Sequence, residues 1–156
     1  MAWEQVQVSV TDERVVDPSH EESNERMVRA SLMRCCAEQA QFVGRTSEGF
    51  TDLIKPFSAV LVGMGEDGHF ASIFPDMDRL DAALDIDNSE PLMKVNTKAS
   101  SLERVTMTLS LLVRRRQIVL LAYGAAKKAV LDDPKGLPVM ALLEQQVAPV
   151  RVIWAP

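Results

Sequence analysis

The stretch AVLVGMGEDGHFASIFP, residues 59–75, decides the predicted fold of this chain. It opens with a continuous apolar run, Ala59 to Val62, bounded by Pro56 and Gly63, and such a run is typical of a strand buried on both faces of a parallel sheet. A glycine-rich loop follows the run, and in an open α/β sheet the loops at the C-terminal strand ends are where ligands bind. We therefore expect a site in residues 63–75, with a short helix that Pro75 closes.

This loop has the composition of a reactive site. Gly63, Gly65 and Gly68 allow close backbone approach and positive φ, and free N–H groups at the start of the next helix favour an anion or a developing oxyanion. Polar residues and glycines surround His69, and histidine is the side chain best suited to exchange protons near neutral pH. We interpret His69 as a general base, with a structural bond to Asp12 as the alternative. The glycine spacing could also indicate a dinucleotide site, but the rest of a nucleotide domain is not apparent.

Downstream of the loop, short apolar runs alternate with helical patterns. The strands are expected at 92–95, 104–109, 118–123 and 150–154, and the helices around 111–115, 125–132 and 139–146. The polar stretch 76–91 is expected to form a short helix and a surface loop. This alternation predicts an α/β fold in which a mostly parallel sheet is flanked by helices.

Upstream of the loop, the pattern changes from strand to helix. Alternating valines over residues 6–10 predict a strand that runs into a charged turn at 11–14. Ser19 and Glu22 have the spacing of a capping box, and apolar residues then recur at helical spacing until Gly44. We expect one long amphipathic helix there.

Composition limits the class of protein. A chain of 156 residues that is 47% hydrophobic has enough apolar side chains to bury the core of one domain, which we place over residues 1–156. The net charge of −5, with scattered lysines and arginines, argues against a nucleic-acid partner. No apolar stretch is long enough to span a membrane. The adjacent Cys35 and Cys36 fall in the helical stretch and are interpreted as buried thiols of a reducing compartment, so we expect a cytoplasmic protein.

The sequence of residues 63–75 resembles the signature of 6-phosphogluconolactonases, whose superfamily also contains glucosamine-6-phosphate deaminases and ribose-5-phosphate isomerases. The resemblance extends from Trp3 to Trp154. Its further elements are Asp12-Glu13-Arg14 followed by Pro18, His20, Ser23 and Asn24, then Arg104-Val105-Thr106, and Gly124-Ala125-Ala126-Lys127. In the deaminases an Asn-Glu pair continues the signature, whereas this chain has Ser72-Ile73-Phe74-Pro75. The lactonase branch therefore fits better.

The resemblance implies a Rossmann-like sheet and hydrolysis of 6-phospho-D-glucono-1,5-lactone to 6-phosphogluconate in the pentose phosphate pathway. It implies no cofactor and no metal; the partner is a small-molecule sugar-phosphate lactone. His69 and Asp67 would be catalytic, with Asp67 or Asp12 orienting His69 or Arg14. The residues expected to bind substrate are Asp12, Arg14, Asn24, Gly65, Gly68, Arg104 and Lys127.

The chain also departs from the family pattern. Family members begin with a strand and helix carrying a Gly-Gly-x-Thr-Pro loop, to which nothing before Trp3 corresponds, and they continue past Trp154 with an aspartate and a last helix. We therefore expect a partial fold, or a homo-oligomer in which a second copy covers the exposed sheet. Phe70 stands where the family usually has threonine and is expected to narrow the loop. Two alternatives to the lactonase are a catalytically impaired domain that binds sugar phosphates or serves association, and a sugar-phosphate isomerase or deaminase.

Overall fold

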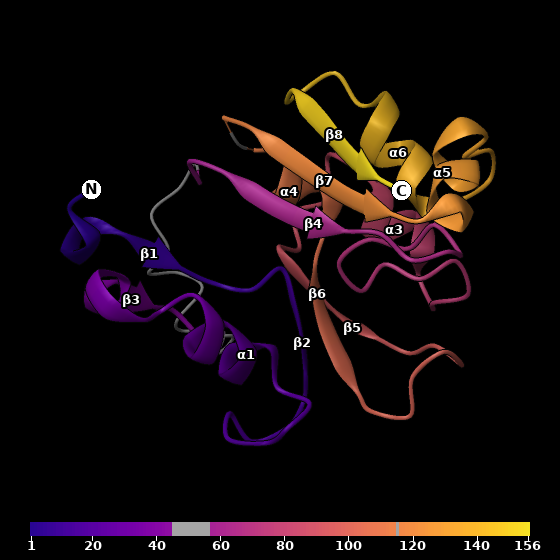
Figure 1. Ribbon diagram of the computed structural model, residues 1–156. Helices are drawn as coiled ribbons and strands as arrows, with labels where there is room; N and C mark the ends of the chain where they lie inside the picture. Colours follow the sequence, from indigo (N-terminus) through magenta and orange to yellow (C-terminus); the bar gives the residue numbers. More distant parts are fainter. Residues whose placement is uncertain (45–56, 115) are drawn as a thin grey trace.

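The computed structural model describes residues 1–44, 57–114 and 116–156, which form an α/β fold (Figure 1). Its central sheet is parallel and has the order β4-β7-β8, with β4 at Val60–Gly63, β7 at Ile118–Tyr123 and β8 at Val150–Ala155. Val60 pairs with Ile118, and Ile118 pairs with Val150, so the three strands start in register. The loop after β4 consequently leaves the sheet at its C-terminal edge.

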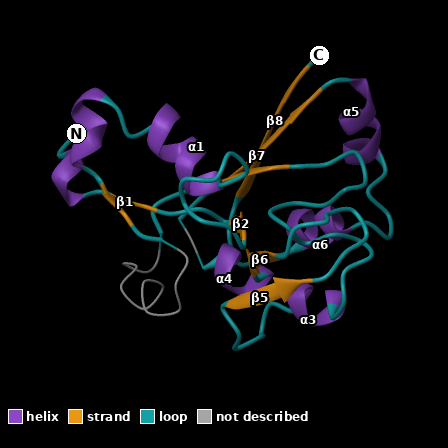
Figure 2. Cartoon of the chain, turned by 90° about the horizontal axis from the view of Figure 1, so that it is seen from below, coloured by secondary structure: helices purple, strands orange, loops and turns teal. Residues whose placement is uncertain are grey.

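Helices cover one face of the central sheet. They are α3 (Leu80–Leu84), α4 (Leu109–Val113) and α6 (Pro138–Glu144), whereas α5 (Ala125–Asp132) follows the C-terminal end of β7. Figures 1 and 2 place α3, α4 and α6 on the same side of this sheet. Ile118 and Leu120 of β7 are fully buried there, together with Leu112 of α4 and Leu142 of α6. This apolar layer is the core that holds the loop after β4 in place.

A second sheet is antiparallel. Its order is β2-β6-β5, with β2 at Asp12–Arg14, β6 at Arg104–Met107 and β5 at Leu92–Val95. Asp12 pairs with Thr106 and Arg14 pairs with Arg104. Because side chains alternate along a strand, these four residues share one face of this antiparallel sheet, which we call the ribbon.

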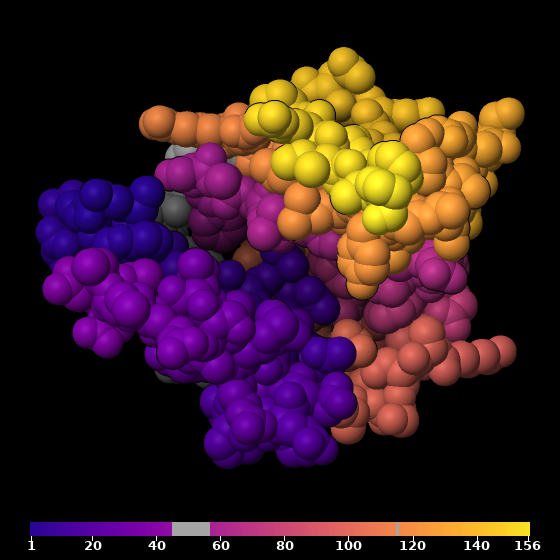
Figure 3. Space-filling model, viewed as in Figure 1, coloured from indigo at the N-terminus to yellow at the C-terminus, as the bar shows by residue number. Residues whose placement is uncertain are grey.

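The N-terminal segment is built from short elements. They are the 3₁₀ turns η1 (Trp3–Gln5) and η2 (Cys35–Gln39), the strands β1 (Gln7–Val8) and β3 (Gln41–Phe42), and the helix α1 (Asn24–Ser31). β1 and β3 pair in parallel. In Figure 3 this indigo-to-violet segment lies beside the rest of the molecule, and the surface is hollowed between the two.

Much of the predicted secondary structure is confirmed. The α/β class and the parallel central sheet are observed, and the expected strands at 92–95 and 118–123 and the helix at 125–132 have the bounds of β5, β7 and α5. The strands at 104–109 and 150–154 and the helices at 111–115 and 139–146 correspond to β6, β8, α4 and α6 with slightly different ends. Pro56 and Arg115, which bounded two of these predictions, lie outside the described residues.

Several predictions for the N-terminal third are wrong. The charged stretch expected as a turn contains β2, because β6 supplies its ladder bonds. The long helix is only α1, and its cap is Ser23, which accepts the N–H of Arg26, rather than Ser19. Cys35 has a φ of 54°, which a continuous right-handed helix cannot contain.

Burial was also overestimated in two places. Cys35 and Cys36 are exposed free thiols, not buried ones. β4 is buried on one face only, since Leu61 is 61% exposed while Val60 and Val62 are buried. The helices cover only the other side of this strand. None of the helices in the described ranges is long and apolar enough to cross a membrane.

Candidate active site

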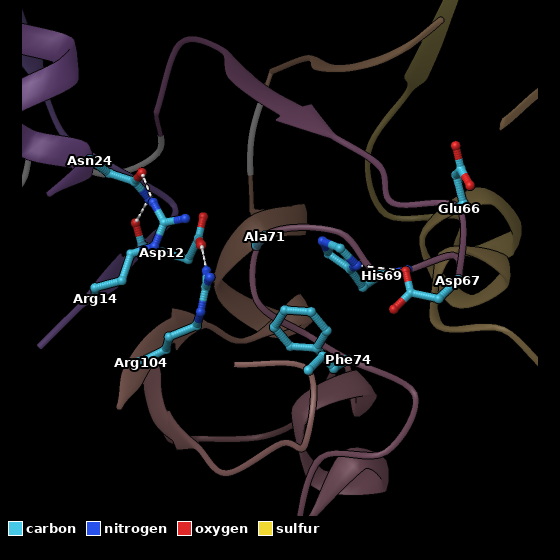
Figure 4. A pocket seen from close by; sticks show the side chains of 10 residues that line it. Asp12, Arg14, Asn24, Glu66, Asp67, His69, Ala71, Phe74 and Arg104 are labelled. Atoms are coloured by element: carbon cyan, nitrogen blue, oxygen red, sulfur yellow. Dashed lines mark hydrogen bonds and ion pairs between the residues drawn. The ribbon is translucent and has the colours of Figure 1, made fainter. Parts of the chain in front are cut away.

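A pocket of about 560 Å³ lies between the antiparallel ribbon and the loop that follows β4. Asp12 and Arg14 of β2, Asn24 of α1 and Arg104 of β6 line one side, and the loop lines the other through residues 66–74 (Figure 4). Segments from three distant parts of the sequence therefore meet here. Pockets of a few hundred Å³ accommodate small metabolites.

The loop side presents a histidine–carboxylate pair. The Nδ1 atom of His69 lies 2.6 Å from Oδ1 of Asp67, and the same oxygen accepts the backbone N–H of His69 at 3.2 Å. Since an ionised carboxylate can only accept, the proton of the neutral ring belongs on Nδ1. The lone pair is then on Nε2, on a side chain that is 30% exposed. This arrangement is suited to taking a proton from water.

Glycines allow the loop to form this pair. The N–H of Gly65 donates to the carbonyl of His69 at 2.9 Å, and the N–H of Gly68 donates to the carbonyl of Gly65 at 3.2 Å. A Cβ on Gly65 would lie closer than 3.0 Å to His69 and Asp67. Gly68 has a φ of 74°, which favours glycine. The short helix expected before Pro75 is not formed; antiparallel bridges from Met64 to Phe70 and from Phe70 to Ile73 brace the loop instead.

The ribbon side presents two guanidinium groups around one carboxylate. Arg14 and Arg104 are directly paired across β2 and β6, and like charges in that position repel. Arg104 Nη1 lies 3.8 Å from Oδ2 of Asp12, while Arg14 Nη1 donates to Oδ1 of Asn24 at 2.8 Å. Asn24 in turn donates to the carbonyl of Asp12 at 2.9 Å. Burial, followed by repulsion from Arg14, lowers the pKa of Arg104.

Phe74 connects the two sides. Its ring centroid is 4.3 Å from that of His69, and the guanidinium carbon of Arg104 lies 5.6 Å from the centroid of the Phe74 ring. Phe74 is only 5% exposed, so it forms an apolar floor (Figure 4). A ligand above this floor would have the imidazole at one end and cations at the other.

The pocket contains most of the residues expected from the sequence. Those that line it are Asp12, Arg14, Asn24, Asp67, His69 and Arg104. Gly65 and Gly68, which were expected to bind substrate, shape the loop, and their N–H groups already donate to carbonyls within it. Among the described residues, no group of three His, Cys, Asp or Glu side chains could hold a metal ion.

Three sequence interpretations differ from the structure. Lys127 does not line the pocket; its ammonium lies 4.6 Å from the centre of the Tyr123 ring. His69 is bonded to Asp67 and not to Asp12, the partner considered for a structural role. Phe70 is fully buried and absent from the pocket lining, so it cannot narrow the site directly.

Sequence reasoning assigned no role to Glu13, Ser72 or Phe74. Glu13 is 5% exposed and accepts the N–H groups of Asn24 and Glu25 at 2.8 Å, so it anchors the first turn of α1. Ser72 is fully buried and contacts Asp12. No pattern in the sequence signalled these contacts, because Glu13 fell in an expected turn and Phe74 was one more apolar residue of the loop.

Comparisons with known proteins agree on one group. The family model described as "Glucosamine-6-phosphate isomerases/6-phosphogluconolactonase" matches residues 1–154. A 6-phosphogluconolactonase of Caulobacter vibrioides is 41% identical, over 98% of this chain and 73% of the relative, and one of Rhizobium meliloti is 32% identical, over 99% and 75%. The crystal structure of a 6-phosphogluconolactonase from Shewanella baltica matches with a TM-score of 0.91 and 31% identity, over all of this chain and 74% of that one.

Proposed function

The chain belongs to the family of glucosamine-6-phosphate isomerases and 6-phosphogluconolactonases, and from this membership we propose that it hydrolyses 6-phospho-D-glucono-1,5-lactone to 6-phosphogluconate. The observation that carries the proposal is the Asp67–His69 pair facing two arginines across one pocket. A lactone hydrolase needs a base beside the ester carbonyl, and a phosphorylated substrate needs cations some distance away. The pocket supplies both groups.

In the proposed reaction His69 acts as the general base. Its Nε2 takes a proton from water as the water oxygen attacks C1 of the lactone, and the carbonyl becomes a tetrahedral oxyanion. Collapse of this intermediate breaks the bond from C1 to the ring oxygen, which receives the proton back from Nε2. Asp67 holds Nδ1–H and stabilises the imidazolium that forms between the two transfers. The product acid then loses a proton to solvent.

Arg14 and Arg104 are proposed to bind the phosphate. A guanidinium can donate two parallel hydrogen bonds to a phosphate, and a dianion would relieve the repulsion between these two paired cations. Asp12 and Asn24 hold the two guanidinium groups in place, because Asp12 lies near Arg104 and Asn24 accepts a hydrogen bond from Arg14. The oxyanion requires a donor other than the N–H groups of Gly65 and Gly68 in this conformation.

We also propose that the reaction takes place in the cytoplasm, which suits a protein with two exposed free thiols. This placement is supported by the thiols and by the expected sugar-phosphate substrate. Reaction of Cys35 and Cys36 with a thiol reagent in intact cells is expected if the compartment is reducing; their complete oxidation there would argue against it.

The experiment compares wild type with His69→Ala on freshly generated 6-phosphogluconolactone, after subtraction of spontaneous hydrolysis. We expect wild type to accelerate hydrolysis and His69→Ala to lose about 10² to 10⁴ in rate, the usual contribution of a general base. His20→Ala is the matched control, because His20 lies in an exposed turn, where its Nδ1 accepts the backbone N–H of Glu22. Binding of 6-phosphogluconate without turnover would indicate an impaired domain, and ammonia release from glucosamine 6-phosphate would indicate a deaminase.

A further inference from the structure

Ser72 connects the loop that carries His69 to the ribbon that carries the two arginines. Its side chain is fully buried, and its Oγ donates to Oδ2 of Asp12 at 2.5 Å. The same Oγ accepts from Nη1 of Arg104 at 3.3 Å. The backbone N–H of Ser72 donates to Oγ1 of Thr106 at 3.2 Å. One residue of the loop thus contacts two neighbouring strands of the ribbon, β2 and β6.

The register of the ribbon makes this contact specific. Asp12 of β2 and Thr106 of β6 are directly opposite each other, and Ser72 bonds to both members of that pair. Two residues further along the same face, Arg14 is opposite Arg104. Fixing Ser72 on the first pair therefore fixes its distance from the second pair.

The loop between Ser72 and His69 is short and internally bonded. Phe70 forms bridges with Met64 and with Ile73, and the N–H of Ile73 donates to the carbonyl of Phe70 at 2.9 Å. Phe70 and Ile73 are fully buried, so the segment cannot tilt without disturbing the core. The position of the His69 ring consequently follows the position of Ser72.

We propose that Ser72 is a positioning residue, which holds the imidazole at the correct distance from the substrate that Arg14 and Arg104 bind; this inference rests on the proposed lactonase function. Ser72 does not line the pocket and does not touch the reacting atoms. It acts through Asp12, which lies on the pocket side of the ribbon. Small displacements between a catalytic group and a bound substrate can lower a rate strongly.

The kinetic test compares Ser72→Ala with Ser110→Ala. Ser110 is 3% exposed and hydrogen-bonds Asn88 and Thr108 away from the pocket, so both variants delete a buried, bonded hydroxyl. We expect Ser72→Ala to lower kcat about tenfold or more while KM stays within about twofold, because both guanidinium groups proposed to bind the phosphate are retained and what changes is their position relative to His69. Ser110→Ala is expected to retain wild-type kcat. Equal kcat values for the two variants would overturn the inference.

A double-mutant cycle tests the route through Asp12. If Ser72 acts by bonding this carboxylate, Ser72→Ala is expected to lower kcat less than twofold further in an Asp12→Ala background. Full additivity of the two losses would contradict a shared role.

A measurement independent of turnover separates this inference from the proposed function. NMR signals of the His69 ring and of the Arg104 Nε–H, which donates to Oγ of Ser100, are compared between wild type and the two serine variants. We expect both signals to shift in Ser72→Ala and neither in Ser110→Ala. Unchanged His69 signals in Ser72→Ala would refute the positioning role even if the chain hydrolyses the lactone. Shifted signals in a chain without lactonase activity would support the positioning role of Ser72 and reject the proposed function.

Discussion

At the scale of single residues, the proposed chemistry of the pocket depends on the proton that His69 Nδ1 shares with Asp67. Asp67 accepts twice from His69, once from the ring and once from the backbone, and this fixes both the tautomer and the orientation of the imidazole. The carboxylate belongs to the same tight turn as the ring it orients. The pair therefore depends on the backbone of the loop more than on distant packing.

Gly65 tests that dependence directly. Gly65→Ala would place a methyl group closer than 3.0 Å to His69 and Asp67, so we expect their hydrogen bond to be lost and kcat to fall about tenfold or more. Gly63→Ala is the matched control, since a Cβ there meets nothing within 4 Å. Steady-state kinetics of both variants checks the prediction. A Gly65→Ala variant with normal kcat would show that the pair is not needed for hydrolysis.

At the scale of elements, the ribbon and α1 are held together by a buried carboxylate. The Oε1 and Oε2 atoms of Glu13 accept from the N–H groups of Arg14, Asn24 and Glu25, and Oε2 also accepts the hydroxyl of Ser23 at 3.1 Å. Carboxylates near a helix N-terminus are favourable, because they satisfy its free N–H groups and oppose its dipole. This contact places Asn24 against Arg14 and so shapes the cationic side of the pocket.

Removing the charge of Glu13 should weaken the contact between β2 and α1. Glu13→Gln turns one acceptor oxygen into a donor that faces other donors, so we expect the free energy of unfolding to fall by about 1–3 kcal/mol. Glu21→Gln, at an exposed position, is expected to change it by less than about 0.5 kcal/mol. Urea denaturation of both variants measures the difference. Equal stability of the two would mean that Glu13 contributes no net stabilisation to α1.

At the scale of the whole molecule, one face of the central sheet is not covered by any helix of the described residues. Helices cover the side of Val60, Ile118 and Leu120, while on the other side Leu61 is 61% exposed and Tyr123 is 71% exposed (Figure 1). The chain spans about three quarters of the length of the relatives that it matches. An exposed apolar sheet face favours association.

We therefore expect the chain to self-associate through this face. Leu61→Glu should shift the sedimentation profile toward monomer, because a carboxylate on the face is costly to bury. Ile86→Glu is the control; Ile86 is also an exposed apolar residue, at 41%, but lies outside the sheet. Analytical ultracentrifugation over a range of concentrations checks the expectation. A wild-type chain that remains monomeric throughout, or equal effects of both substitutions, would contradict it.

Taken alone, the sequence was sufficient for the local features. The apolar run before the glycines predicted β4, the spacing of apolar residues predicted β5, β7 and α5, and the loop motif indicated the family. The catalytic roles of His69 and Asp67 stay predictions. These features depend on neighbours along the chain, where periodicity and turn chemistry act over a few residues.

Only the tertiary structure decided how distant segments meet. The pairing of Arg14 with Arg104, the contact of Ser72 with Asp12 and the burial of Glu13 under α1 all join residues that no periodicity relates. It also placed Lys127 outside the pocket, although the sequence treated it like the arginines. The physical reason is that cross-strand register and helix docking are set by long-range packing, whereas a sequence pattern records only which side chains favour burial and at what local spacing.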